Sequence, residues 1–304
     1  MRRSQKKLVR LHRLVLNWYG ENARRLPWRG KADPYGVLVS EVMLQQTQVN
    51  RVLIKYPQFM SLFPTLRRLA SSTQREVVTA WRGMGYNNRA VRLHRLARHI
   101  IEQRNGRWPA DVEGLRELPG VGRYTAHAMM VFAFRKEVPV VDVNIRRVLS
   151  RLFWKMPDTA SVRDEKEIWT IARQTLPDGL AYDWIQALMD LGSSICTARA
   201  PACVRCPVRT VCASSGRMER PRGRKALPEP SRRGIPNRVF RGRIIEALRP
   251  GRSGLTLGRL GRSITSDFGP KDMPWLTSLV HALQRDGLVR ISRRRNASPR
   301  VSLA

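Results

Sequence analysis

The spacing of apolar residues predicts a mainly helical chain. Leu8, Leu11, Val15 and Trp18 recur at helical spacing, which indicates an amphipathic helix near the start. From residue 34 to about residue 200 nearly every segment repeats its apolar positions with the period of a helix, and Pro and Gly separate the segments. No convincing strand-like alternation occurs there. We therefore expect an all-α fold made of short helices.

The pattern changes after Cys212. Residues 214–236 are rich in Ser, Gly, Arg and Pro, which is typical of a linker. The segments that follow predict three helices and then the start of a short hairpin, at residues 239–248, 255–264, 275–286 and 287–291. This order indicates a small winged-helix-like domain over residues 237–304, with Arg293–Arg295 on its wing. A plain helical dimerisation module is the alternative.

The charge of the chain indicates a polyanionic partner. Its 304 residues include 57 Lys and Arg but only 23 Asp and Glu, a formal net charge of +34. The excess is spread over the whole chain, so one basic tail does not explain it, and nucleic acid is the leading class of partner. Solubility or an arginine-rich codon bias would be the simpler explanation. No apolar stretch approaches the roughly 20 residues of a membrane helix, and no signal sequence is apparent, so we expect a cytoplasmic protein without a membrane partner.

All four cysteines fall within seventeen residues. Cys196, Cys203, Cys206 and Cys212 have the spacing C-x6-C-x2-C-x5-C. A disulfide framework would spread its cysteines through the fold of an exported protein, so this cluster predicts a metal site. Zinc and a [4Fe–4S] cluster both take four thiolates, and the spacing alone leaves both open.

Residues 118–126 have the pattern of a helix, a tight turn and a second helix. Gly120 and Gly122 allow a close approach to another backbone, and the free N–H groups of the following helix can bind an anion. A DNA phosphate gripped in this way is held without sequence readout. Any tight helical hairpin would give the same pattern.

Two carboxylates are candidates for catalysis. Glu41 lies in an apolar run, and such surroundings favour the protonated form that a general acid needs. Asp142 precedes a helical segment, where its simplest role is to cap that helix. An acid and an anion together would suit cleavage of a glycosidic bond through an oxocarbenium-like transition state. The alternative for Glu41 is an exposed polar position on an amphipathic helix.

Together, the hairpin, Asp142 and the four cysteines resemble the helix-hairpin-helix/Gly-Pro-Asp superfamily of DNA glycosylases with an iron–sulfur cluster. The resemblance covers roughly residues 5–213. Five segments look like its adenine DNA glycosylase (MutY-type) branch: Leu26–Arg29, Asp33–Tyr35, Ser40–Val49, Gly83–Tyr86 and Gln186–Gly192.

The resemblance implies a base-flipping enzyme that removes adenine paired with guanine or 8-oxoguanine. Glu41 matches the acid that protonates the adenine N7, and Asp142 matches the carboxylate that stabilises the sugar cation. Asn144 would orient Asp142. Tyr124 stands where lyase-active relatives carry a Schiff-base lysine, and a phenol forms no imine. Little or no strand cleavage at abasic sites is therefore expected.

The resemblance also assigns binding residues. Gln46 and Tyr86 match wedge residues that hold the duplex open, while Trp28, Arg29 and Gln186 match positions that line the adenine pocket. The four cysteines match the ligands of a [4Fe–4S] cluster, which makes iron–sulfur the expected cofactor. The expected partner is double-stranded DNA with a mismatched or oxidised base pair, bound by a monomer that associates with the nucleoid.

The implied organisation is two α lobes and a tail. Residues 1–29 and 137–213 would form the lobe with the cluster loop, and residues 30–136 a six-helix barrel lobe with the hairpin. The chain departs from the family pattern at three places: Val143 replaces a glycine, Asn87 replaces a second tyrosine, and the tail is too short for the Nudix-like domain of longer members.

Three other functions remain possible from the sequence. A glycosylase for thymine or uracil opposite guanine also carries tyrosine at the position of Tyr124, although Gln186 suits adenine better. A DNA-binding iron–sulfur regulator would need neither Glu41 nor Asp142. An abasic-site lyase would need the amine that Tyr124 lacks.

Overall fold

The computed structural model describes residues 2–154, 164–216, 229–251, 253–292 and 298–304. Contacts between residues divide the chain into two compact units. The first unit contains residues 1–38 and 109–225, and the second contains residues 39–108 and 226–304. No helix in the described parts of the chain is long and apolar enough to cross a membrane.

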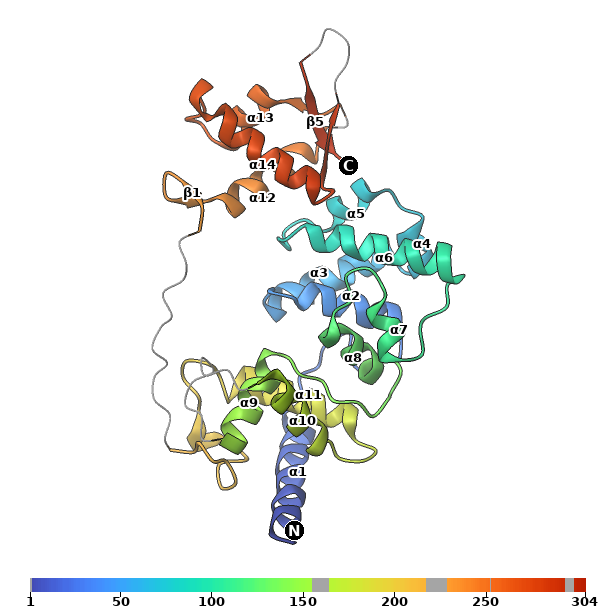
Figure 1. Cartoon of the computed structure of the whole chain (residues 1–304), viewed down its shortest axis with the longest axis vertical. Coiled ribbons are helices and arrows are strands. Elements are labelled where there is room, and N and C mark those ends of the chain that lie inside the picture. Colours follow the sequence, from blue (N-terminus) through green and yellow to red (C-terminus); the bar gives the residue numbers. More distant parts are fainter. Residues whose placement is uncertain (1, 155–163, 217–228, 252, 293–297) are drawn as a thin grey trace. The chain divides into compact units, whose positions relative to one another are not determined.

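The first unit is a bundle of helices, drawn mainly in blue and in green to yellow in Figure 1. The long helix α1 packs against α11, which in turn packs against α9, while α7 packs against α8. Buried side chains such as Val15 and Trp184 form the core between them. The helices are α1 (Arg2–Asn22), α7 (Val112–Arg116), α8 (Arg123–Phe132), α9 (Val143–Trp154), α10 (Glu165–Gln174) and α11 (Ala181–Ser194), with a 3-10 turn at Cys203–Arg205.

The helical part of the second unit is built on α6, against which α4 and α5 pack. Thr65 and Thr73 accept hydrogen bonds from free N–H groups at the starts of α4 and α5, and Thr73 forms a capping box with Glu76. The helices are α3 (Val49–Leu62), α4 (Leu66–Ala70), α5 (Gln74–Ala80) and α6 (Asn88–Arg104); α2 (Pro34–Leu44) begins in the first unit and ends in the second.

The second unit also contains the C-terminal domain. Its elements are the short pair β1 (Ser231–Arg232) and β2 (Ile235–Pro236), then α12 (Asn237–Leu248), β3 (Leu255–Thr256), α13 (Leu257–Ile264), a 3-10 turn (Pro270–Asp272), α14 (Met273–Arg285), β4 (Val289–Ser292) and β5 (Arg300–Leu303). An antiparallel sheet of order β3-β5-β4 packs with the three helices, which is the order of a winged helix.

The C-terminal domain differs from the sequence prediction at one helix. The segment 255–264 begins as the strand β3, and its helix starts only at Leu257, where Thr256 caps it. Gly254 lies so close to β5 that a Cβ atom there would be 2.5 Å from the carbonyl oxygen of Val301. Strand pairing therefore overrides the helical pattern at these two residues.

The prediction of an all-α fold of short helices with a small C-terminal winged domain is confirmed. Arg293–Arg295 and most of the predicted linker, residues 217–228, lie outside the described residues. The lobe and domain boundaries given above stay a prediction.

Candidate active site

Asp142 lies directly before α9 and caps it. One carboxylate oxygen accepts a hydrogen bond of 2.6 Å from the backbone N–H of Ile145, and the other accepts one of 2.9 Å from Nδ2 of Asn144. Burial raises the pKa of Asp142 above its ordinary value, although both hydrogen bonds oppose this shift. The carboxylate is thus held in one orientation in a place that penalises its negative charge.

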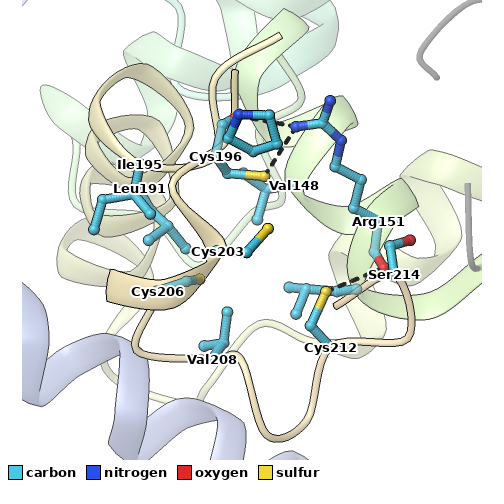
Figure 2. A pocket seen from close by; sticks show the side chains of 12 residues that line it. Val148, Arg151, Leu191, Ile195, Cys196, Cys203, Cys206, Val208, Cys212 and Ser214 are labelled. Atoms are coloured by element: carbon cyan, nitrogen blue, oxygen red, sulfur yellow. Dashed lines mark hydrogen bonds between the residues drawn. The ribbon is translucent and has the colours of Figure 1, made fainter. Parts of the chain in front are cut away.

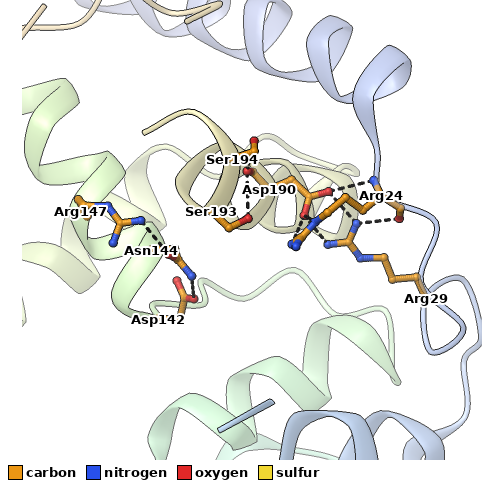
Figure 3. A network of polar contacts seen from close by, with 8 residues as sticks. All are labelled: Arg24, Arg29, Asp142, Asn144, Arg147, Asp190, Ser193 and Ser194. Atoms are coloured by element: carbon orange, nitrogen blue, oxygen red, sulfur yellow. Dashed lines mark hydrogen bonds and ion pairs between the residues drawn. The ribbon is translucent and has the colours of Figure 1, made fainter. Parts of the chain in front are cut away.

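Asn144 is itself held in place by a buried arginine. Its Oδ1 accepts a hydrogen bond of 2.7 Å from Nη2 of the buried Arg147, which also donates to the carbonyl oxygen of Gly192 at 2.6 Å. A Cβ atom at Gly192 would be 2.7 Å from Cβ of Asn144, so α11 approaches α9 closely only because this residue is glycine. Figure 3 shows the resulting series from Arg147 through Asn144 to Asp142.

A second polar cluster joins the segment after α1 to α11. Arg29 forms a bidentate ion pair with the buried Asp190, with both N–O distances 2.8 Å, and Arg24 pairs with the same carboxylate (Figure 3). The terminal nitrogens of Arg29 are therefore engaged inside the first unit. Trp28 is buried in the same segment, and Gln186 is buried in α11. The predicted contacts of these residues with adenine stay a prediction.

The hairpin predicted at residues 118–126 is formed by α7, a turn and α8. Gly120 has a φ angle of +80°, a left-handed conformation that favours glycine, and Gly122 stands at the N-cap of α8. Both glycines are exposed, so the first N–H groups of α8 face solvent. Tyr124 is the second residue of α8 and is partly buried.

Glu41 lies in α2 and its side chain is only 6% exposed. It belongs to the second unit, whereas Asp142, Tyr124 and Gln186 belong to the first. The exposed polar position considered as an alternative for Glu41 is wrong, because this residue lies on the buried side of its helix.

Gln46 and Tyr86 occupy two exposed turns of the second unit. Their φ angles are +55° and +43°, and the Tyr86 side chain is 53% exposed. Left-handed conformations are unfavourable for such residues and persist only where the surroundings impose them. The two predicted wedge residues are therefore the projecting tips of constrained turns.

Buried Arg89 of α6 holds both turns. Its guanidinium donates to six oxygens in two groups: around the end of α2, those of Val42, Met43, Gln45 and Thr47, and before Tyr86, those of Met84 and Gly85. The distances lie between 2.6 and 3.2 Å. Helix C-termini leave carbonyl groups without partners, and a buried guanidinium satisfies them here.

The four cysteines line a single pocket of the first unit, with a volume of about 30 Å³ (Figure 2). Apolar side chains such as Val148 and Leu191 form the rest of its wall. Nη1 of Arg151 lies 3.4 Å from Sγ of Cys196. Burial raises the pKa of the Cys206 thiol to about 11; a bound metal reverses this effect because it stabilises the thiolate. No group of three or more His, Cys, Asp or Glu side chains placed to share a single metal ion occurs among the described residues.

Comparison with known proteins decides the family. Residues 39–174 match the model of the HhH-GPD superfamily base excision DNA repair protein. Adenine DNA glycosylase from Mycobacterium tuberculosis (strain CDC 1551 / Oshkosh) is 37% identical over 279 residues, which cover 88% of either chain. The chain belongs to the HhH-GPD superfamily, in its adenine DNA glycosylase branch.

Other relatives agree with this membership. Human adenine DNA glycosylase is 41% identical over 67% of this chain, which spans only 39% of the length of the human protein. A thermostable thymine-DNA glycosylase has the same fold, with a TM-score of 0.65 and 30% identity over 70% of this chain and 98% of its own. An endonuclease III–DNA covalent intermediate, 22% identical with a TM-score of 0.57, shares the fold over 68% of this chain and 96% of its own.

Several residues that build this HhH-GPD site were not found from the sequence. Arg89, Arg147, Arg151 and Asp190 are all buried and hydrogen-bonded to loops or helix ends. A charged residue in an amphipathic helix gives no sequence signal that separates such a role from an exposed position. Only the resemblance of the segment Gln186–Gly192 to the adenine DNA glycosylase branch pointed to this part of α11.

Proposed function

We propose that the protein is a monofunctional DNA glycosylase of base-excision repair that hydrolyses the N-glycosidic bond of adenine paired with guanine or 8-oxoguanine. The observation that carries the proposal is the buried carboxylate of Asp142, fixed by Asn144 and the N-terminus of α9, in a chain 37% identical over 88% of its length to an adenine DNA glycosylase. It acts as a monomer on double-stranded DNA of the nucleoid.

The surroundings of Asp142 suit stabilisation of a cation. Glu41 donates a proton to N7 of the flipped adenine, the bond between N9 and C1′ breaks, and positive charge develops on the sugar. Burial raises the pKa of Asp142, so its anion is poorly stabilised until that positive charge appears. The attraction is therefore stronger in the transition state than in the ground state, which is the condition for catalysis. Water then adds to C1′, and its proton leaves to solvent.

Tyr124 makes the enzyme monofunctional. A lyase of this type needs a primary amine to attack C1′ and form an imine. The phenol of Tyr124 cannot do so, and strand breaks should appear only after alkali. Tyr124→Lys is expected to introduce a complex that borohydride traps.

DNA is held by the exposed hairpin and opened by the two turns. The free N–H groups at the start of α8 bind a backbone phosphate, with Gly120 and Gly122 allowing the close approach. Gln46 and Tyr86 enter the duplex where the adenine leaves it. Trp28, Arg29 and Gln186 line the pocket that receives the base.

Cys196, Cys203, Cys206 and Cys212 hold a [4Fe–4S] cluster. The apolar wall of their pocket and the guanidinium of Arg151 beside Cys196 suit a buried, negatively charged cluster. These four thiolates would hold the cluster, and its binding would cross-link the loop that follows α11. Iron, sulfide and zinc analysis of the purified protein distinguishes it from the alternative zinc site.

Single-turnover release of the base from four labelled duplexes tests the proposal. The duplexes carry adenine opposite 8-oxoguanine, adenine opposite guanine, thymine opposite guanine and uracil opposite guanine, and each is assayed with and without alkali. Release of adenine alone, with strand breaks only after alkali, is expected. Glu41→Gln should abolish release while duplex binding stays nearly intact.

Two other results would contradict it. Release of thymine or uracil would favour the mismatch glycosylase, the second candidate, which the 30% identity to a thymine-DNA glycosylase supports. No release from any duplex, by protein with a full complement of iron, would favour a DNA-binding regulator.

A further inference from the structure

Two arginines of the second unit make reciprocal contacts: each donates hydrogen bonds to carbonyl oxygens near the C-terminal end of the other's helix. Arg249 follows α12 of the C-terminal domain, and its Nη1 donates to the carbonyl oxygens of Val78 and Thr79 at the end of α5, at 3.1 Å for Thr79. Arg75 of α5 donates in return to carbonyl oxygens at the end of α12, at 2.7 Å for Arg249 and 3.0 Å for Gly251.

Each arginine thus donates hydrogen bonds to carbonyl oxygens at or just after the end of the other helix. The last carbonyl groups of an α-helix have no partner within it, and the negative end of the helix dipole attracts a cation. Arg249 is only 9% exposed, although it carries a charge. Arg249 is therefore buried in the contact between the C-terminal domain and α5, and it differs in this from a solvent-exposed basic residue.

Arg249 also reaches the turn that carries Tyr86. Its Nη2 lies 3.3 Å from Oδ1 of Asn87, the residue directly after Tyr86 and directly before α6. The Asn87 side chain does not cap α6. One guanidinium therefore joins the end of α5 to the first residue after the projecting tyrosine, whereas Arg89 contacts the two residues before it.

We infer that Arg249 is a positioning residue by which the C-terminal domain holds the turn 81–87, and with it Tyr86, in the conformation that opens DNA. The inference rests on the proposed function for the role of Tyr86, and it gives the tail a task other than adding positive charge. Asn87, a departure from the tyrosine pair of the family motif, is the acceptor that makes this contact.

Hydrogen–deuterium exchange of the full protein without DNA tests whether Arg249 holds the turn 81–87. Arg249→Ala should increase exchange about tenfold or more at the amides of Met84, Arg89 and Ala90, which bond to the carbonyl oxygens of Trp81, Tyr86 and Asn87. Arg249→Lys should restore part of the protection. Arg262→Ala is the matched control, because it removes one exposed charge from the same domain, at the end of α13, and should leave this region unchanged. Unchanged exchange in Arg249→Ala would overturn the inference.

Duplex opening tests the link to Tyr86. With 2-aminopurine beside the target adenine, Arg249→Ala should slow the fluorescence rise about tenfold, while the dissociation constant for the duplex changes about as little as in Arg262→Ala. The double variant Arg249→Ala/Tyr86→Ala should open DNA no more slowly than Tyr86→Ala alone, since residues that act as one unit are not additive. Additive losses would overturn the inference.

A second variant avoids loss of the whole contact. Asn87→Ala removes the acceptor while Arg75 and Arg249 keep their carbonyl partners, so the C-terminal domain stays in place. It should slow opening in the same direction as Arg249→Ala and to a smaller extent; normal opening would contradict the proposed link. If the wild-type protein released no adenine, the proposed function would fail, but the exchange experiment would still decide whether Arg249 holds the turn 81–87.

Discussion

Two buried arginine clusters hold the segments that carry the proposed substrate contacts, and they differ in chemistry. In the first unit, Arg29 and Arg24 share the carboxylate of Asp190, and they fix the segment that contains Trp28. In the second unit, Arg89 fixes the turns of Gln46 and Tyr86 through hydrogen bonds to neutral oxygens, without a carboxylate partner among the described residues. Both clusters hold an irregular backbone, one by an ion pair and the other by satisfying carbonyl groups.

The difference decides how each cluster responds to pH. Burial alone would raise the pKa of Asp190, but the hydrogen bonds and charges of Arg29 and Arg24 outweigh it and hold this pKa below the ordinary value. Burial lowers the pKa of Arg89 to about 10, so its charge persists at neutral pH. Its carbonyl partners do not titrate. Only the first cluster should therefore be sensitive to acid.

Arg89→Met should have the largest effect on stability. Methionine fills part of the space but donates no hydrogen bond, so six oxygens at the end of α2 and before Tyr86 each lose one donor. Loss of a buried charged partner of this kind costs about 4 kcal/mol. Urea unfolding measures the loss, and adenine release should fall with it because both turns lose their support. A stability close to wild type would show that water replaces the guanidinium.

Asp190→Asn should cost slightly less, about 3 kcal/mol at neutral pH, because two guanidinium groups lose their counter-charge inside the first unit. Arg29, with a side chain 10% exposed, cannot recover full hydration. The loss is measured by urea unfolding at pH 7, and Asp183→Asn, on the same helix, is the control for the change in net charge.

The pH dependence of that loss separates the two clusters. The folded pKa of Asp190 is lowered, so its stabilisation is complete above the unfolded pKa of about 3.9 and disappears as the pH falls through the folded value. The difference between wild type and Asp190→Asn should thus be constant above about pH 5 and shrink below about pH 4. The difference between wild type and Arg89→Met should stay constant over this range. Parallel behaviour of both variants would remove the distinction.

Gly192→Ala tests whether the close packing of α11 against Asn144 fixes the orientation of the Asp142 carboxylate. Gly192 stands two residues after Asp190, and a methyl group there would press on Cβ of Asn144 at 2.7 Å and on its backbone at 3.3 Å. Overpacking of this kind costs about 2 kcal/mol, and displacement of Asn144 should slow base release about tenfold or more. Gly20→Ala in α1, where a Cβ atom meets nothing within 4 Å, is the control and should not reduce stability.

Some of this organisation was readable in the sequence, and some was not. The helical periodicity predicted the fold class, and the pattern of residues 118–126 predicted a tight turn between two helices, which the structure contains between α7 and α8. The start of β3 at Leu255 was missed, because pairing with β5 is a tertiary contact that overrides the local pattern. Asp142 was expected either to cap a helix or to stabilise a cation; the structure contains the cap, and the second role stays a prediction.

The positive charge indicated nucleic acid as the partner, and the DNA glycosylase relatives agree with this, but some basic residues are buried in the fold and others are exposed. Arg75, Arg89, Arg147 and Arg249 all donate to carbonyl oxygens at or near the ends of helices. These guanidinium groups are therefore engaged by carbonyl oxygens within the fold and are not free to contact a phosphate directly, although they keep their positive charge. The sequence could not separate the two groups, because burial depends on which helices meet.

The smallest expected effect is that of Arg98→Ala, on the same helix as Arg89. Arg98 pairs with Glu102 at 2.8 Å, but both side chains are about half exposed. Solvent screens such a pair, and its loss should cost about 0.4 kcal/mol, reduced further by salt. Urea unfolding at low and high ionic strength measures this. One helix thus offers two arginines that differ mainly in burial: if Arg98→Ala and Arg89→Met destabilised the protein equally, the stabilisation assigned to the buried guanidinium would belong to α6 as a helix and not to its contacts with the turns.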